Sequence, residues 1–213
     1  MKVYYFNITV LRNRKIFDQQ VKTLDNERAE KVEGLRVTAD KLRCVGAGIL
    51  IHFVREQYGI DSDVAVDKFG KPYFVNSDIK FNISHSGMFV IMAVSDYNLG
   101  IDIQKIKEDK HRIAEKSFLA SECEYINEIE DEKVMQQRFC EVWTLKEAYL
   151  KNIGIGLRKP LNSFEIQLGG DAPSIKGKID YHFVQFKIND LYMVAICTDT
   201  KDTEFSIDEV VLQ

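Results

Sequence analysis

The chain has 213 residues, which is enough for one large domain or two domains of about 100 residues each. Hydrophobic residues make up 45% and aromatic residues 11% of it, so a packed core is expected rather than disorder. The formal net charge of −4 excludes a globally basic nucleic-acid-binding protein, although not a local basic patch. The four cysteines are scattered, and no apolar run approaches the ~20 residues of a membrane span. We therefore expect a reduced, cytoplasmic protein without a nucleic-acid or membrane partner.

The first part of the chain alternates between strand-like and helical apolar patterns. Asp25 is a suitable N-cap for its first helix, and Gly59 is a suitable end for its second. The predicted elements, in order, are a strand at Lys2–Val10, helices at Leu24–Glu33 and Ala39–Tyr58, and a strand pair within Val64–Val75 that is broken by the turn Phe69–Pro72.

The stretch from Phe81 to Gln104 combines buried strands with polar groups. It predicts two apolar strands joined by a polar turn, and then a short third strand that carries Asp102 and Gln104. Strand residues two apart project from the same face, so these two side chains point together, away from Ile101 and Ile103. A carboxylate in an apolar strand is costly without a partner or a cation, which makes Asp102 a candidate functional residue.

The second part begins after a charged connector at Lys105–Lys110, our candidate domain boundary, which divides the chain into 1–105 and 106–213. A capping box at Ser121 and Glu124 predicts one helix, and Phe139–Lys151 is a stronger one. Predicted strands follow at Phe164–Leu168, Ser174–Ile179, Tyr181–Ile188, Tyr192–Thr198 and Val210–Leu212. The strand pair that starts at Phe186 repeats the pattern of the pair that starts at Phe81, which indicates two similar α+β halves, although any buried hairpin has this pattern.

The helix Phe139–Lys151 places charges beside its apolar stripe. At about 100° per residue, Lys146 falls within that stripe, and Glu147 and Lys151 lie along its edge, one turn apart. A solvated ion pair between residues four apart is the simplest explanation of a Glu/Lys pair. Here, however, the position beside Trp143 indicates that the charges reach a cleft or a ligand.

Four short motifs, taken together, resemble the 4′-phosphopantetheinyl transferases of the Sfp type. Their order and spacing also resemble that family, and the apolar pattern extends the likeness over nearly the whole chain. The motifs are FGKP (Phe69–Pro72), FNISHSG (Phe81–Gly87), GIDIQ (Gly100–Gln104) and F…WTLKEAYLK..G.GL (Phe139–Leu157).

The resemblance implies an α+β fold of two similar halves, a pseudo-dimer with the active site at the interface. It implies transfer of the phosphopantetheine arm of coenzyme A to a serine of an apo acyl or peptidyl carrier protein, with release of adenosine 3′,5′-bisphosphate. Mg²⁺ is the implied metal, with Mn²⁺ as a substitute, and the protein is expected to be a monomer. The pathway can be fatty-acid, polyketide or nonribosomal-peptide biosynthesis.

The family also implies roles for individual residues. Asp102 and Glu147 would bind the metal, and Gln104 stands where many relatives carry a glutamate, so its place as a ligand is open. Glu147 is the candidate base for the carrier serine, directly or through a metal-bound water. Lys151 would contact a phosphate oxygen or orient Glu147.

For coenzyme A, the match assigns the 3′-phosphate to Ser84 and His85. The further phosphate candidates are Lys71, Arg43, Lys31, Arg28 and Lys146. Ordinary helix-surface charge is the alternative for Arg43, Lys31 and Arg28, and a surface lysine whose stem covers apolar residues is the alternative for Lys146. Arg158, Lys159 and the region 111–138 are candidates for carrier docking.

Two other functions remain open at this point. One is another Mg²⁺-dependent phosphoryl or nucleotidyl transferase, although the chain has no P-loop and no glycine-rich dinucleotide motif. The other is a catalytically weak relative that binds carrier protein or coenzyme A without efficient transfer, which only Gln104 favours.

Overall fold

The computed structural model describes residues 1–106, 113–170 and 172–212. Its helices are α1 (Arg14–Val21), α2 (Asn26–Gly34), α3 (Thr38–Tyr58), α4 (Ala114–Ser117), α5 (Ala120–Asn127) and α6 (Glu132–Asn152), with 3₁₀ turns η1 (Ile8–Arg12), η3 (Gly156–Arg158) and η4 (Leu161–Ser163). Its strands are β1 (Lys2–Asn7), β2 (Val64–Val66), β3 (Pro72–Phe74), β4 (Lys80–Ser86), β5 (Phe89–Ser95), β6 (Leu99–Lys105), β7 (Ile166–Gln167), β8 (Ser174–Ile175), β9 (His182–Ile188), β10 (Tyr192–Thr198) and β11 (Ser206–Glu209).

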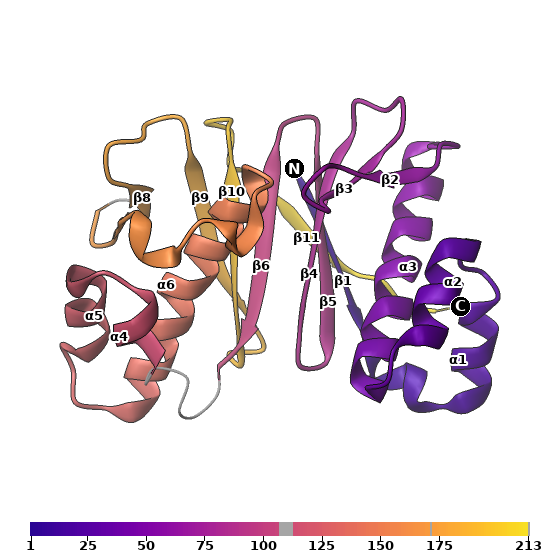
Figure 1. The fold of residues 1–213 in the computed structure, drawn as a ribbon, viewed down its shortest axis with the longest axis horizontal. Helices are drawn as coiled ribbons and strands as arrows, with labels where there is room; N and C mark the ends of the chain where they lie inside the picture. Colours follow the sequence, from indigo (N-terminus) through magenta and orange to yellow (C-terminus); the bar gives the residue numbers. More distant parts are fainter. Residues whose placement is uncertain (107–112, 171, 213) are drawn as a thin grey trace.

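Two sheets face each other in the middle of the molecule, and a long helix covers the outer face of each (Figure 1). The four-stranded sheet has the order β11-β1-β5-β4, and the three-stranded sheet has the order β6-β10-β9. Neighbouring strands are antiparallel except β1 and β11, which are parallel. The predicted α+β class with two similar halves is therefore confirmed, since each half pairs a mainly antiparallel sheet with a long helix.

Strand alternation divides the apolar residues of the described chain into three clusters. On β5, for example, Met92 packs toward α3, whereas Ile91 lies in the cluster between the two sheets. On β10, Val194 belongs to the same central cluster, and Ala195 faces α6. The central cluster holds the two sheets together, and the outer clusters fix α3 and α6 against them.

The seam between the two sheets is made by polar side chains of β4. The backbone N–H groups of Ile101, Ile103 and Lys105 donate to the side-chain oxygens of Asn82, Ser84 and Ser86, at 2.9, 3.3 and 2.9 Å respectively. These side chains occupy the place that backbone carbonyls take in an ordinary strand pair. Asn82, Ser84 and Ser86 of the FNISHSG motif therefore join the two sheets.

Most of the predicted elements are present. Asp25 caps α2, with its carboxylate accepting from the N–H of Arg28, and α3 ends at Gly59 in the left-handed conformation. The strand predicted to run to Val10 ends at Asn7, where η1 begins. Within the proposed boundary at Lys105–Lys110, residues 107–110 lie outside the described residues.

Other predicted elements were wrong in position. Helix α6 begins at Glu132 rather than Phe139, because the Asp131 side chain accepts from the N–H groups of its first turn. The predicted capping box at Ser121 is wrong: the reach-back bond runs from the N–H of Leu119 to Glu122 Oε2, at 3.0 Å. The last strand is β11, four residues earlier than predicted, and α1 was not predicted at all.

The two sheets do not follow the predicted division at residue 105. Strand β6 lies within 1–105 but pairs with β10, and β11 lies within 106–213 but pairs with β1. Each half of the sequence therefore lends one strand to the sheet of the other half.

Candidate active site

Helix α6 lies directly on strand β6 at Gly100. A Cβ atom at this position would lie 2.1 Å from the backbone oxygen of Ala148 and 2.3 Å from the backbone nitrogen of Asn152. Only glycine leaves room for so close an approach of a helix to a strand. The contact brings the last two turns of α6, which carry Glu147 and Lys151, over the part of β6 that carries Asp102.

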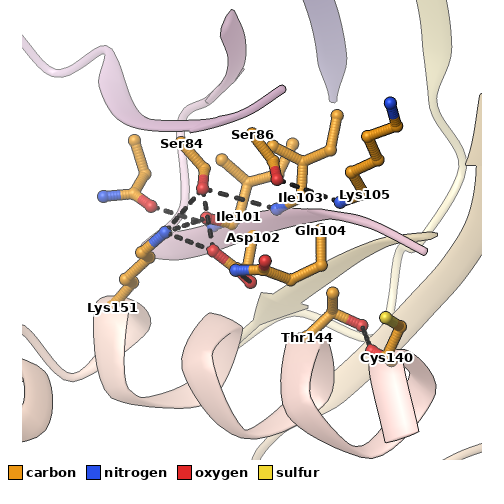
Figure 2. A network of polar contacts seen from close by, with 11 residues as sticks. Ser84, Ser86, Ile101, Asp102, Ile103, Gln104, Lys105, Cys140, Thr144 and Lys151 are labelled. Carbon is orange, nitrogen blue, oxygen red and sulfur yellow. Dashed lines mark hydrogen bonds and ion pairs between the residues drawn. The ribbon is translucent and has the colours of Figure 1, made fainter. Parts of the chain in front are cut away.

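Asp102 is buried and both of its carboxylate oxygens have partners (Figure 2). Its Oδ1 accepts from Lys151 Nζ at 2.7 Å and from Ser84 Oγ at 2.8 Å, and its Oδ2 accepts from Gln104 Nε2 at 3.4 Å. The predicted placement of Asp102 and Gln104 on one face of β6 is therefore present.

Glu147 is the second buried carboxylate at this point, only 9% exposed. Its Oε1 is buried and has no hydrogen-bond partner within the described part of the chain. Desolvation, and then the negative charge of Asp102, raise the pKa of the Glu147 carboxyl, and the charge of Lys151 opposes them. An unpaired, buried carboxylate oxygen that is exposed to the charge of a second carboxylate is a place where a cation would be favourable.

The donor set fits a hard divalent cation better than a soft one. Two carboxylates and the amide oxygen of Gln104 are oxygen ligands, which Mg²⁺ prefers while it keeps several waters. No group of three or more His, Cys, Asp and Glu residues that could hold a metal occurs among the described residues. Asp102 and Glu147 are the two carboxylates that a metal at this point would have available.

Lys151 and Ser84 join α6 to both sheets. Lys151 Nζ donates to Ser84 Oγ at 2.8 Å and to the carbonyl of Ile101 at 3.1 Å, besides its bond to Asp102. Ser84 Oγ donates to Asp102 and accepts from Lys151 and the N–H of Ile103, which uses the whole capacity of a hydroxyl. Ser84 therefore holds Asp102 and Lys151 in place. The sequence suggested instead that this hydroxyl contacts the 3′-phosphate.

His85 follows Ser84 on β4 and projects from the opposite face. Desolvation of the imidazole, and then the positive charges of Arg43 and Lys151, lower the pKa of His85, even though the residue as a whole is exposed. Arg43 donates to Asp40 at 3.0 Å, while its Nε is buried without a partner among the described residues. The positive charge of Arg43 is thus near enough to affect the His85 imidazole.

The other two predicted cations of the first half lie on α2. Arg28 packs over Gly48 of α3 and is 3.8 Å from Asp25, and its Nε is also buried without a described partner. Lys31 is exposed. Neither residue contacts the site around Asp102, and both remain candidates for the more distant part of a large substrate.

Lys71 reaches the second half of the chain. Its Nζ donates to the carbonyl of Leu99 at 3.0 Å and to the carbonyl of Asn152 at 3.1 Å, and burial lowers its pKa. It lines an open cleft of about 540 Å³ between the halves, together with Tyr73, Tyr181 and other residues. The sequence suggested that Lys71 contacts a phosphate, whereas in the structure its ammonium donates to two backbone oxygens.

Lys146 does not reach the site, contrary to its prediction as a phosphate contact. The residue has no exposed surface, and its Nζ contacts Glu122 Oε1 at 2.7 Å and the carbonyls of Leu161 and Phe164 at 2.8 and 2.6 Å. All three of its N–H groups are used inside the second half. The stripe of α6 on which it lies is buried, and a glutamate at the start of α5 supplies the countercharge.

The two cations suggested for carrier docking lie over different aromatic rings. The Arg158 guanidinium lies over the ring of Phe69 at 5.1 Å, and Lys159 Nζ lies over the rings of Tyr149 and Phe164 at 5.6 and 5.1 Å. The candidate region 111–138 begins with two residues outside the described part of the chain and continues through α4 and α5.

Sequence reasoning missed the parts that support the site. Asn82, Ser86 and Gly100 lie within the quoted motifs but were given no role, and Glu122 was not considered. A signal was available for Gly100, since a glycine inside an apolar strand often marks a close backbone approach. No sequence pattern pairs Glu122 with Lys146, because the two residues are 24 positions apart and lie on different helices.

A carboxylate pair beside a lysine, with arginines on helices of the same half as β4, is an arrangement that suits phosphorylated substrates. Comparison with known proteins agrees: residues 98–197 match the 4′-phosphopantetheinyl transferase superfamily. A 4′-phosphopantetheinyl transferase of Bacillus subtilis is 31% identical over 196 residues, 87% of this chain and 86% of the relative. The chain belongs to this family.

Two further relatives carry related names. The 4′-phosphopantetheinyl transferase Sfp of Bacillus subtilis (strain 168) is 30% identical over 212 residues, which cover 95% of this chain and 94% of the relative. The 4′-phosphopantetheinyl transferase gsp of Aneurinibacillus migulanus is 46% identical over 103 residues, 47% of this chain and 41% of the relative. Within the described residues, no helix is long and apolar enough to cross a membrane.

Proposed function

We propose that this protein transfers the 4′-phosphopantetheine arm of coenzyme A to a serine of an apo acyl or peptidyl carrier protein. The products are the holo carrier protein and adenosine 3′,5′-bisphosphate. Membership of the family supports the reaction class. The single observation that carries the proposal is the meeting of Asp102, Glu147 and Lys151 where α6 crosses β6.

Asp102 and Glu147, with Gln104 beside them, would hold Mg²⁺, and Mn²⁺ is the expected substitute. The unpartnered Oε1 of Glu147 and the all-oxygen donor set support this assignment. When bound, the ion neutralises charge on the diphosphate of coenzyme A and orients it. Asp102 already has Lys151 as a positive partner, so the free site is held in shape by an ion pair within the chain.

The reaction needs two groups from the protein: one that accepts a proton and a positively charged side chain that contacts the phosphate. The serine hydroxyl of the carrier attacks the phosphorus next to pantetheine, the bond from that phosphorus to the departing adenosine bisphosphate breaks, and the serine proton is released. Glu147 would accept that proton, directly or through an intervening water, and its raised pKa supports this role. Lys151, already 2.7 Å from Asp102, would donate to a phosphate oxygen during the transfer.

The nucleotide end of coenzyme A needs donors at a distance from the metal. His85 and Arg43 are the best supported, because they interact with each other and because the Nε of Arg43 is buried without a described partner. Arg28 has the same property, and Lys31 is exposed one turn further along α2. We assign these four residues to the 3′-phosphate and the adjoining surface.

A mass measurement tests the proposal. The protein is mixed with coenzyme A, Mg²⁺ and an apo carrier, and the carrier is weighed by mass spectrometry. A gain of one phosphopantetheine arm is expected, and Asp102→Ala and Glu147→Ala should each abolish it. No gain with several fatty-acid, polyketide and nonribosomal-peptide carriers would support the weak relative that Gln104 suggested.

A further inference from the structure

The turn between β2 and β3 belongs to the first half of the chain and reaches toward the second half. Asp67 Oδ1 accepts from the N–H groups of Phe69 and Lys71 at 2.8 and 2.9 Å, and the N–H of Asp67 donates to the carbonyl of Lys71 at 2.9 Å. These bonds give the turn a fixed shape. The side chain of Lys71 therefore starts from a defined backbone and extends toward α6.

The ammonium of Lys71 joins two elements that carry the site. Its bond to the carbonyl of Leu99 reaches the start of β6, three residues before Asp102, and its bond to the carbonyl of Asn152 reaches the end of α6, one residue after Lys151. The carbonyls at a helix C-terminus lack intrahelical donors and carry partial negative charge, so a cation is favourable there.

The end of α6 is tied from a second side by Asn152 itself. The Nδ2 atom of Asn152 donates to the carbonyls of Asn98 and Cys197, at 3.3 and 3.0 Å. Lys71 supplies the bond from the first half, and Asn152 supplies the bonds to the turn before β6 and to β10. The distance between the last turn of α6 and β6 is thus set in two ways. Hydrogen bonds fix it at Asn152, and close packing of the helix backbone fixes it at Gly100.

We propose that Lys71 is a positioning residue of the transfer reaction. It ties the C-terminal end of α6 to the N-terminal end of β6, and so fixes Glu147 and Lys151 against Asp102. This proposal rests on the proposed function, and it replaces the coenzyme A contact that the sequence suggested for Lys71. Both N–H groups that the structure accounts for are directed at backbone oxygens.

Two measurements separate positioning from substrate binding in the Lys71→Met variant. The first is Mn²⁺ affinity of the protein without coenzyme A, from electron paramagnetic resonance of free Mn²⁺. Loss of positioning should weaken it several-fold, although Lys71 is not a proposed ligand. The second is steady-state kinetics with an apo carrier, where kcat should fall at least tenfold while the KM for coenzyme A stays within about twofold.

The matched control is Lys80→Met, which removes the same charge from a residue lining the same cleft. It should leave Mn²⁺ affinity and kcat at wild-type values. A Lys71→Met protein with wild-type Mn²⁺ affinity and kcat, but a raised KM for coenzyme A, would overturn the proposal in favour of a direct contact.

A second variant decides the matter if Lys71→Met does not fold. In Lys71→Arg the charge remains, but a longer side chain with a planar guanidinium presents its donors to these two carbonyls in a different geometry from an ammonium. We expect a lower kcat at an unchanged KM for coenzyme A, and a wild-type kcat would contradict positioning. The Mn²⁺ measurement needs no turnover, so a failure of the proposed reaction is distinguishable from a failure of this proposal.

Discussion

Replacing Lys146 by methionine removes an ammonium that is wholly enclosed by the second half of the chain. The side chain keeps nearly its length and apolar stem, so little cavity is created. What is lost is the ion pair with Glu122 and the two bonds to the carbonyls of Leu161 and Phe164. Glu122 keeps its bonds from the N–H groups of Leu119 and Ile166, but it becomes a buried charge without a cation.

The expected cost follows from that unpaired charge. Removing one partner of a buried ion pair destabilises a protein by about 3–5 kcal/mol. For a chain of this length, roughly 2–4 °C of melting temperature is lost per kcal/mol, so the melting temperature should fall by about 10 °C. The double variant Glu122→Gln/Lys146→Met removes the unpaired charge and should recover a large part of the loss.

Urea unfolding gives the measurement, because Trp143 is the chain's single tryptophan and lies one turn before Glu147 on α6. Below the transition, the folded Lys146→Met protein should keep the wild-type KM for coenzyme A. A variant of wild-type stability with a raised KM would refute this reasoning, and it would show that the ammonium contacts the substrate's phosphates after all.

Three further changes test the site. Gly100→Ala places a Cβ 2.1 Å from the oxygen of Ala148, so α6 must move; we expect a loss of about 1–3 kcal/mol in urea unfolding and a larger loss of transfer activity than of stability. Glu147→Gln should raise the melting temperature at pH 8 and have no effect near pH 4, because a carboxyl whose pKa is raised by folding is destabilising only once it ionises; an equal effect at both pH values would contradict this. Gln104→Glu should stay active and need less Mg²⁺, since a carboxylate would replace the amide that donates to Asp102; a higher Mg²⁺ requirement in a titration would contradict it.

The central elements of the site were predictable because their signals are local. Period-two alternation places Asp102 and Gln104 on one face of a strand, and helical spacing places Glu147 and Lys151 one turn apart. The four motifs added the family. The role of Ser84 was not predictable from periodicity, although Ser84 lies within a motif. Its neighbour in sequence, His85, projects from the other face of the same strand, so the two residues serve different parts of the molecule.

The less predictable parts depend on contacts between distant segments. Lys146 was expected at a phosphate because a cation in an apolar stripe needs a reason, and the reason proved to be Glu122. The start of α6 at Glu132 depends on the Asp131 cap, which a charged stretch hides from apolar periodicity. Lys71 has two backbone carbonyls as partners, and no side-chain pattern can predict a backbone acceptor.

The parallel pairing of β11 with β1 has a consequence for the order in which the protein can fold. Lys2 pairs with Ser206, so this contact closes a loop of nearly the whole chain. Until residues 206–209 have left the ribosome, β1 is an edge strand with an open row of N–H and C=O groups, a template for pairing with another chain. Folding of the first half is therefore completed only after residues 206–209 have been synthesised, and a chain cut before β11 should aggregate through β1.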